Sequence, residues 1–267
     1  MNKLSGKNAI VTGATSGIGE SIAKRFSAEG ANVALVGRRK EKGEKAAANI
    51  NDQGGKAIYV EADVTDSKSV DRMTNICMER FAGRISILVN NAGISTGNAL
   101  MEYVTEEDWD RVMNTNAKGT FLCTRAVIPY MIKSGGGSVI NMSSAGGLRG
   151  YVGGTSYASS KAAVIMLTKI LAVEHGKDNI RANCILPGST HSEMFDEGVK
   201  NFVKRMSGQA GSVTAEQIMD NIAKGIPLGR IGTPEDAANL VLFLSSAEAS
   251  YVNGAIIVCD GGQSAGL

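Results

Sequence analysis

Short apolar runs and longer amphipathic stretches alternate along this chain from one end to the other. Seven runs rich in β-branched and small apolar residues are expected to be strands: residues 8–11, 32–36, 57–60, 85–89, 138–142, 181–185 and 255–258. Each run is apolar at nearly every position, which is typical of parallel strands covered on both faces. Six stretches between them are expected to be helices: residues 18–29, 40–52, 67–81, 106–132, 156–175 and 234–245. The pattern therefore predicts a doubly wound α/β fold with a mostly seven-stranded parallel sheet.

The chain shows no sign of a division into domains. It contains only 4 prolines, no linker rich in Pro or Ser and no internal repeat, so residues 1–267 are predicted to form one Rossmann-like domain. The one long interruption of the pattern, residues 191–225, mixes charges with five large apolar residues: Met194, Phe195, Phe202, Met206 and Met219. Segments of this length in compact domains are often lids. We expect either a lid over a substrate site or an ordinary part of the core.

Composition narrows the classes of function. The 28 basic and 26 acidic residues are spread along the chain and give a net charge of +2, which provides no strong field for nucleic acid or an anionic membrane. Aromatic residues make up only 5%, which argues against a base-stacking surface. The polar N-terminus resembles neither a signal peptide nor a membrane span, and the 4 cysteines lie far apart, without metal-ligand spacing. We therefore expect a cytoplasmic protein that binds neither nucleic acid nor membranes nor a metal.

A glycine-rich turn joins the first expected strand to the first expected helix. Residues 12–19 read TGATSGIG, and the glycines allow a tight turn and the close approach of a pyrophosphate to the N–H donors of a helix N-terminus. A tight turn that binds no ligand is the alternative, but ligands of open α/β sheets bind outside the carboxyl ends of the strands, where this turn lies. The expected phosphate contacts are Gly13, Thr15, Ser16, Gly17, Ile18 and Gly19.

The end of the second expected strand bears on the choice of dinucleotide. An Asp or Glu there would accept hydrogen bonds from both ribose hydroxyls and select NAD, but the sequence reads Val-Gly-Arg-Arg at residues 36–39. Arg38, with Arg39 beside it, therefore favours NADP(H), because a guanidinium suits a 2′-phosphate; NAD(H) remains the alternative. Arg38 could also stack on adenine or lie in solvent. Asp63 and Val64, after the third strand, are expected near the adenine, although Asp63 could instead cap the following turn.

Three side chains suggest acid–base chemistry. Tyr157 and Lys161 stand four residues apart on an expected helix and so share one of its faces, and Ser144 follows the fifth expected strand. Hydride delivery to a carbonyl leaves an alkoxide that needs a proton, and a tyrosine has a pKa of about 10 that a nearby lysine cation is expected to lower. Ser144 would donate a hydrogen bond to the substrate oxygen. A Tyr–Lys pair alone is usually a surface pair, so the interpretation depends on its combination with the glycine turn.

Taken in order, the motifs resemble those of the short-chain dehydrogenase/reductase family over nearly the whole chain. They are TGxxxGxG at 12–19, NNAG at 90–93, Ser144, YxxxK at 157–161, Pro-Gly at 187–188 and Asp-Gly-Gly at 260–262. The resemblance implies a catalytic tetrad of Asn116, Ser144, Tyr157 and Lys161. Asn116, favoured over Asn114 by an Asn-x-x-Gly pattern, would position a water behind Lys161. Further implied cofactor contacts are Asn90, Ala92, Gly93, Tyr157, Lys161, Pro187, Gly188, Thr190 and Ser192.

The resemblance also implies an activity and an assembly. Hydride transfer between the cofactor and a ketone or secondary alcohol is expected, in a homotetramer. The substrate stays open between a 3-oxoacyl thioester and a sterol, sugar or polyol, and the apolar residues of 191–225 favour a bulky apolar one. A dinucleotide sensor or scaffold without turnover is the alternative of another class, which the intact tetrad argues against. Sugar-nucleotide epimerases and dehydratases share YxxxK but have a longer C-terminal part, and only about a hundred residues follow Lys161 here.

Overall fold

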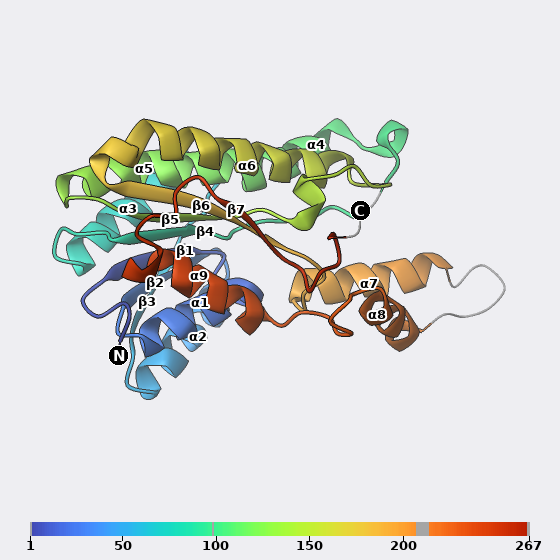
Figure 1. Ribbon diagram of the computed structural model, residues 1–267, viewed down its shortest axis with the longest axis horizontal. Helices are drawn as coiled ribbons and strands as arrows, with labels where there is room; N and C mark the ends of the chain where they lie inside the picture. Colours follow the sequence, from blue (N-terminus) through green and yellow to red (C-terminus); the bar gives the residue numbers. More distant parts are fainter. Residues whose placement is uncertain (1, 98, 207–213, 266–267) are drawn as a thin grey trace.

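A computed structural model describes residues 2–97, 99–206 and 214–265, and its centre is one seven-stranded sheet (Figure 1). All six strand pairings are parallel, in the order β3-β2-β1-β4-β5-β6-β7. The strands are β1 (Asn8–Thr12), β2 (Asn32–Gly37), β3 (Lys56–Glu61), β4 (Ile87–Asn90), β5 (Gly137–Met142), β6 (Ile180–Pro187) and β7 (Ile256–Cys259). The predicted doubly wound α/β domain is confirmed. The strand order reverses between β1 and β4, and ligands of such sheets bind at that reversal.

Helices cover both faces of the sheet (Figure 1). On one face lie α1 (Gly17–Ala28), α2 (Lys40–Asp52) and α9 (Pro234–Ser245), and on the other α3 (Ser67–Arg80), α5 (Gly119–Lys133) and α6 (Thr155–His175). Successive residues of β1 belong to opposite layers: Val11 packs with Phe26 and Val241, whereas Ile10 packs with Met73 and Met131. Because both faces are buried, every residue of β1 is buried, and this explains the unbroken apolar runs in the sequence.

The single helix expected over residues 106–132 is interrupted. The structure has α4 (Glu106–Met113), a π-helical segment (Asn114–Lys118) and then α5. At this insertion the N–H of Gly119 bonds to the carbonyl of Asn114, five residues back, and the Thr120 hydroxyl donates to the carbonyl of Asn116 at 2.8 Å. One extra residue in a turn leaves the apolar pattern almost unchanged, so periodicity predicts an unbroken helix. π-Helical segments are frequent at functional sites.

Residues 191–225 form a helix pair beside the main body of the domain (Figure 1). It consists of α7 (Glu193–Met206) and α8 (Ala215–Lys224), while residues 207–213 of the expected lid lie outside the described part of the chain. Met194 is 40% and Phe202 50% exposed, so these two side chains are not ordinary core. Val199, at 5% exposed, packs inward. The assignment as a lid stays a prediction.

The helix α6 is unusually long and apolar. Thr155–Asp178, which is α6 and the 3-10 turn after it, could cross a membrane by length and composition alone. Within the most apolar window 44% of the helix is buried, and α6 packs against β6. One such helix is weak evidence for a membrane span, because a helix of a soluble protein can pass the same test of length and composition. The other short 3-10 segments are Met101–Tyr103, Ala145–Gly147 and Ala247–Ala249.

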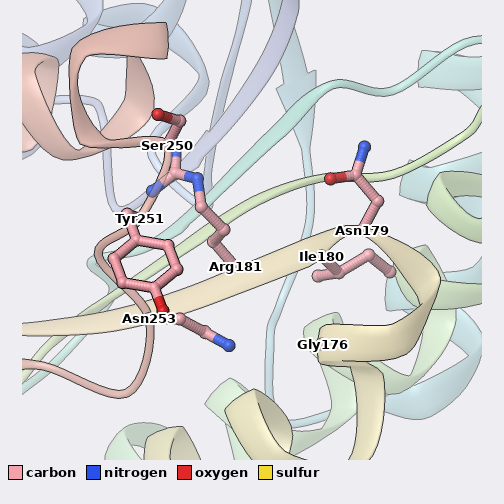
Figure 2. Close-up of a pocket in the computed structure, with 7 residues that line it drawn as sticks. All are labelled: Gly176, Asn179, Ile180, Arg181, Ser250, Tyr251 and Asn253. Atoms are coloured by element: carbon pink, nitrogen blue, oxygen red, sulfur yellow. The ribbon is translucent and has the colours of Figure 1, made fainter.

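A hollow of about 350 Å³ lies at the amino end of β6, away from the edge where the predicted site residues gather (Figure 2). Arg181 lies in it, and its guanidinium donates to the carbonyl oxygens of Val252 at 3.3 Å and Ser246 at 3.2 Å. The arginine therefore ties the chain before β7 to β6. The lining residues are Gly176, Asn179, Ile180, Arg181, Ser250, Tyr251 and Asn253, none of which belongs to the predicted site.

Candidate active site

The glycine-rich turn between β1 and α1 is as tight as its sequence suggests. Gly13 and Gly17 have φ angles of +65° and +58°, in the left-handed region that favours glycine. A Cβ atom on Gly13 would come within 2.8 Å of the Ala92 Cα atom, and one on Gly19 would overlap the Gly13 carbonyl. Ser16, the residue before α1, makes no side-chain capping bond in the described part of the chain. The turn thus forms a cradle at a helix N-terminus, which fits a pyrophosphate.

The NNAG segment after β4 holds this turn in place. The Asn91 side-chain amide donates to the carbonyl oxygens of Thr12 at 3.0 Å and Gly13 at 3.1 Å. In return, the Thr12 hydroxyl accepts from the backbone N–H groups of Asn91 at 3.0 Å and Ala92 at 3.1 Å. Asn90 points elsewhere and donates to the Asn141 side chain at 2.8 Å. Asn91 therefore supports the glycine turn structurally. The sequence marked it only as part of the NNAG motif.

Ser144, Tyr157 and Lys161 come together at the carboxyl end of β5. Ser144 directly follows Ser143 after β5, and it lies close enough to Tyr157 to lower the pKa of that phenol. The Lys161 Nζ atom lies 5.7 Å from the centre of the Tyr157 ring and donates to the Met142 carbonyl at 2.8 Å. The Ser143 hydroxyl donates to the Lys161 carbonyl at 2.8 Å. The strand end and the first turns of α6 are thus bonded together through backbone atoms, which fixes the geometry of the three side chains.

The acidities of these groups differ from the sequence expectation. Burial raises the pKa of Tyr157 to about 12, against a smaller lowering by the Ser144 hydrogen bond. Burial also lowers the pKa of Lys161 to about 8. The expectation that Lys161 lowers the pKa of Tyr157 is therefore wrong for this structure. Removal from water disfavours both charged forms, and at 5.7 Å the ammonium lies over the ring rather than at the phenol oxygen.

Asn116 is held by the backbone on the other side of the site. Asn116 is only 1% exposed. Its side-chain oxygen accepts from the Ile94 N–H at 2.8 Å, and its side-chain nitrogen donates to the Ile94 carbonyl at 2.9 Å and to the Ser160 hydroxyl at 3.0 Å. Both amide donors are thus in use and the side chain positions the chain after β4, while its role in holding a water stays a prediction. A Cβ on Gly93 would lie 3.3 Å from both Asn116 Oδ1 and Lys161 Nζ, so all three residues meet at one point.

The segment after β6 approaches the glycine turn from the opposite side. A Cβ on Gly17 would lie 3.5 Å from the Cβ of Ser192. Ser192 accepts from the Phe195 N–H at 3.2 Å and so caps α7, and the Thr190 hydroxyl donates to the Gly188 carbonyl at 3.2 Å. The hydroxyls of Thr190 and Ser192, implied as cofactor contacts, therefore also order the backbone of this segment. Pro187 ends β6.

The Asp-Gly-Gly motif near the C-terminus supports this segment. Asp260 accepts from the N–H groups of Gly262 at 2.9 Å and Ser264 at 2.8 Å, which folds the chain into a turn. Gln263 then accepts from the Ser189 N–H at 3.2 Å. Any side chain on Gly188 would overlap Asp260. The sequence carried the motif, but only the structure gives its partner.

At the adenosine end, the two arginines after β2 take different paths. Arg38 is 66% exposed, and its nearest acidic atom is Asp63 Oδ2 at 3.8 Å. Arg39 reaches back over the glycine turn and donates to the Thr15 hydroxyl at 2.8 Å and the Ser16 hydroxyl at 2.6 Å. It also pairs with Glu193 at the start of α7. Sequence reasoning missed Glu193, since nothing near it in the chain marks it.

The residues after β3 have structural roles. Asp63 Oδ1 accepts from the Thr65 N–H at 2.9 Å and its hydroxyl at 2.8 Å, so Asp63 caps the turn, and its contact with the adenine stays a prediction. Burial would raise the pKa of Asp63, but these hydrogen bonds and the charge of Arg38 hold it below its usual value. Val64 is 8% exposed, and a Cβ on Gly119 would come within 2.8 Å of it. Ile18 packs against the core layer beneath α1.

The edge as a whole fits a nicotinamide dinucleotide. The glycine cradle at a helix N-terminus suits the phosphates, and Ser144, Tyr157 and Lys161 gather at the carboxyl end of β5, on the same edge of the parallel sheet. In the described part of the chain, no group of three or more His, Cys, Asp or Glu side chains is arranged to hold a metal ion. The chemistry that the residues offer is proton transfer to a carbonyl oxygen or from an alcohol hydroxyl.

Comparison with known proteins places the chain in a class. A family model described as enoyl-(acyl carrier protein) reductase matches residues 13–264. The chain belongs to the short-chain dehydrogenase/reductase family, and it is an NAD(P)-dependent oxidoreductase of the CH–OH/C=O type.

Particular relatives carry several activities. The chain is 40% identical over 260 residues to a 3-oxoacyl-[acyl-carrier-protein] reductase of Thermotoga maritima, covering 97% of this chain and 98% of the relative. It is 35% identical over 259 residues to a meso-2,3-butanediol dehydrogenase of Serratia marcescens, covering 97% and 95%. Among solved structures, levodione reductase superposes with a TM-score of 0.93 at 33% identity, covering 99% of this chain and all of the other. The fold and reaction class are shared, while the named substrates differ.

Proposed function

We propose that this protein is an NADP(H)-dependent ketone reductase, or secondary-alcohol dehydrogenase, in which Tyr157 is the general acid and base. The observation that supports this best is the position of Lys161 Nζ, 5.7 Å from the centre of the Tyr157 ring, with Ser144 close enough to lower the pKa of the same phenol. Titratable groups whose pKa values are shifted by burial are candidates for acid–base chemistry, and both Tyr157 and Lys161 are shifted in this way.

In the reducing direction, the nicotinamide, when bound, supplies the hydride to the carbonyl carbon. The Ser144 hydroxyl donates a hydrogen bond to the substrate oxygen and so stabilises the negative charge that develops there. The Tyr157 phenol donates its proton to that oxygen. With a pKa of about 12, the phenol stays protonated at neutral pH and is ready to donate. Lys161, held by the Met142 carbonyl, keeps a cation beside the ring at neutral pH, below its own pKa of about 8.

The choice of NADP(H) over NAD(H) rests on charge at the adenosine end. In the described part of the chain, no carboxylate follows β2 directly, and Arg38 and Arg39 stand there. Gly37 lets the end of β2 pack directly against the glycine turn, because a Cβ atom on it would come within 2.7 Å of the Thr15 side chain. An extra phosphate on the ribose would meet guanidinium groups at this place.

For the substrate we propose a ketone with a sizeable apolar part, of which a 3-oxoacyl thioester is the first candidate. The 3-oxoacyl-[acyl-carrier-protein] reductases among the relatives support that candidate. Exposed apolar side chains near the ends of the site also support it: Leu148, Val152, Met194 and Phe202. The segment 191–225 is proposed as the lid that carries the last two.

We further propose a homotetramer located in the cytoplasm. Large apolar side chains are exposed on α5 and α6, at Phe121, Met166, Ile170 and Val173. Val173 is 85% exposed, which is unusual on a helix that otherwise packs in the core. A second copy covering these helices would bury them. The mass of the protein in solution tests this, and a monomeric mass would contradict it.

The function is tested by titrating the purified protein separately with NADPH and NADH, followed by a panel of ketones. Preference for NADPH and reduction of 3-oxoacyl thioesters is expected. A preference for NADH would leave the reaction class in place and move the search to alcohol oxidation. Binding of neither would contradict the proposal and favour a scaffold role.

A further inference from the structure

Glu193 places a carboxylate among the cations at the adenosine end of the site. It belongs to the first turn of α7, yet its partners come from the other side of the cofactor edge. Its Oε2 atom pairs with the Arg39 guanidinium and accepts from the Ser16 hydroxyl at 3.1 Å, and its Oε1 atom accepts from Lys42 Nζ at 2.6 Å. Two cations and a hydroxyl thus converge on one carboxylate.

The groups around this carboxylate are those that an additional phosphate would use. Ser16 lies in the glycine turn, Arg39 follows β2 and Lys42 lies in the first turn of α2. The turn and the end of β2 touch, since a Cβ on Gly37 would come within 2.7 Å of Thr15. The adenosine ribose of a sheet-bound dinucleotide lies near the end of the second strand, so its 2′ substituent would enter this cluster. Phosphate and carboxylate oxygens prefer the same donors.

We infer that Glu193 is a specificity-determining residue: its carboxylate occupies the 2′-phosphate position and competes with NADP(H) for Arg39, Lys42 and Ser16. The inference rests on the proposed function. It adds a carboxylate that opposes phosphate binding to the two arginines that favour it. NADP(H) must displace Glu193, whereas NAD(H) brings no competing phosphate. The cation pair therefore favours NADP(H) less strongly than its charge suggests.

The strength of the competition follows from exposure. Glu193 and Arg39 are both 45% exposed and Lys42 is 53% exposed, so the ion pairs are screened by solvent and each contributes little. The donors nevertheless keep Glu193 ionised, since hydrogen bonds from Lys42 and Arg39 lower its pKa to about 2. The carboxylate is thus a weak but permanent competitor across the physiological pH range.

A Glu193→Gln variant tests the inference because it removes the charge and keeps the shape. We expect the Kd for NADPH, measured by titration of the purified protein at low salt, to fall about three- to tenfold, and the Kd for NADH to change less than about twofold. Glu197→Gln removes the same charge one turn further along α7 and is the matched control, expected to leave both constants unchanged. Thermal unfolding of both variants shows whether the fold is retained.

Each outcome decides. An unchanged Kd for NADPH in Glu193→Gln would overturn the inference while leaving the proposed function in place, provided the wild type binds NADPH. A selective loss of NADH affinity would also overturn it, because Glu193 would then be an acceptor for the ribose hydroxyls. An equal gain in NADPH affinity in Glu197→Gln would also overturn it, because the effect would then come from the net charge of α7 and not from the position of Glu193. A wild type that binds neither cofactor contradicts the proposed function instead.

Discussion

The two ends of the cofactor edge are built in different ways. At the catalytic end, Lys161 is 5% exposed and bonded to the Met142 carbonyl, and Asn116 is 1% exposed and bonded to the Ile94 backbone. At the adenosine end, Arg38, Arg39 and Glu193 are 45–66% exposed, and their partners are mainly charged side chains and hydroxyl groups. Main-chain atoms of the core position the side chains of the catalytic end, whereas the adenosine end is held by ion pairs between exposed side chains, which solvent and salt weaken. Catalysis should therefore be sensitive to the loss of single atoms at the catalytic end, and cofactor binding should be sensitive to charge and salt at the adenosine end.

The largest effect is expected at the catalytic end, in Lys161→Ala. The change removes the cation beside Tyr157 and the bond to the Met142 carbonyl, so kcat should fall about 100-fold or more. Lys169→Ala, two turns further along α6 on an exposed position, is the control and should retain wild-type kcat. Equal rates in the two variants would remove Lys161 from the mechanism. Steady-state ketone reduction measures the difference.

The pH dependence should differ between the two directions of reaction. Alcohol oxidation needs the Tyr157 phenolate, and because burial raises the pKa of Tyr157 to about 12, the phenolate fraction rises about tenfold per pH unit below that value. Lys161, with a pKa lowered to about 8, loses its charge above that pH, so the rise should flatten there. Ketone reduction should stay nearly level from pH 6 to about 8, because the phenol is protonated throughout. Oxidation rates independent of pH would contradict these assignments.

At the adenosine end, Arg39→Ala should weaken NADPH binding about tenfold, because Arg39 is the guanidinium that crosses the glycine turn. Arg38→Ala should weaken it less than about threefold, since Arg38 lies 3.8 Å from Asp63 and is mostly exposed. The difference should shrink as salt is added. Titrations at two ionic strengths check both points, and a larger loss in the Arg38 variant would restore the assignment made from sequence.

For Asn116→Ala we expect the smallest effect on NADPH binding and a clear loss of stability. It leaves the Ile94 N–H and carbonyl without their partner and should cost about 2–4 kcal/mol, or about 5–10 °C in Tm. Asn114→Ala, at the start of the same π-helical segment, should shift Tm by less than about 2 °C. Thermal unfolding distinguishes the two asparagines, which the sequence pattern alone could not separate securely. Equal shifts would contradict the bonding described for Asn116.

The same contrast explains what could be predicted from the sequence. The seven strands follow from unbroken apolar runs, and Tyr157 and Lys161 could be paired because a helix brings residues four apart onto one face. The π-helical segment at Asn114–Lys118 could not be predicted, since one inserted residue barely alters an apolar period. The raised pKa of Tyr157 depends on burial, which no local pattern reports.

Glu193 was beyond sequence reasoning for a different reason. It lies 154 residues from Arg39 and 151 from Lys42, and only the path of the chain after β6 brings them together. Exposed charges of this kind carry no apolar pattern, so their partners emerge only from the fold. Arg38 was favoured over Arg39 on position alone, and the structure shows that the neighbouring side chain reaches the glycine turn.

We propose that Tyr157 transfers the proton in a nicotinamide-dependent ketone reduction. The most direct test measures NADPH binding and single-turnover ketone reduction for the wild type and Tyr157→Phe, which loses one oxygen atom and keeps the ring. The account predicts unchanged NADPH affinity and a rate lowered at least about 100-fold. A Tyr157→Phe variant that reduces the ketone at close to the wild-type rate would contradict the account.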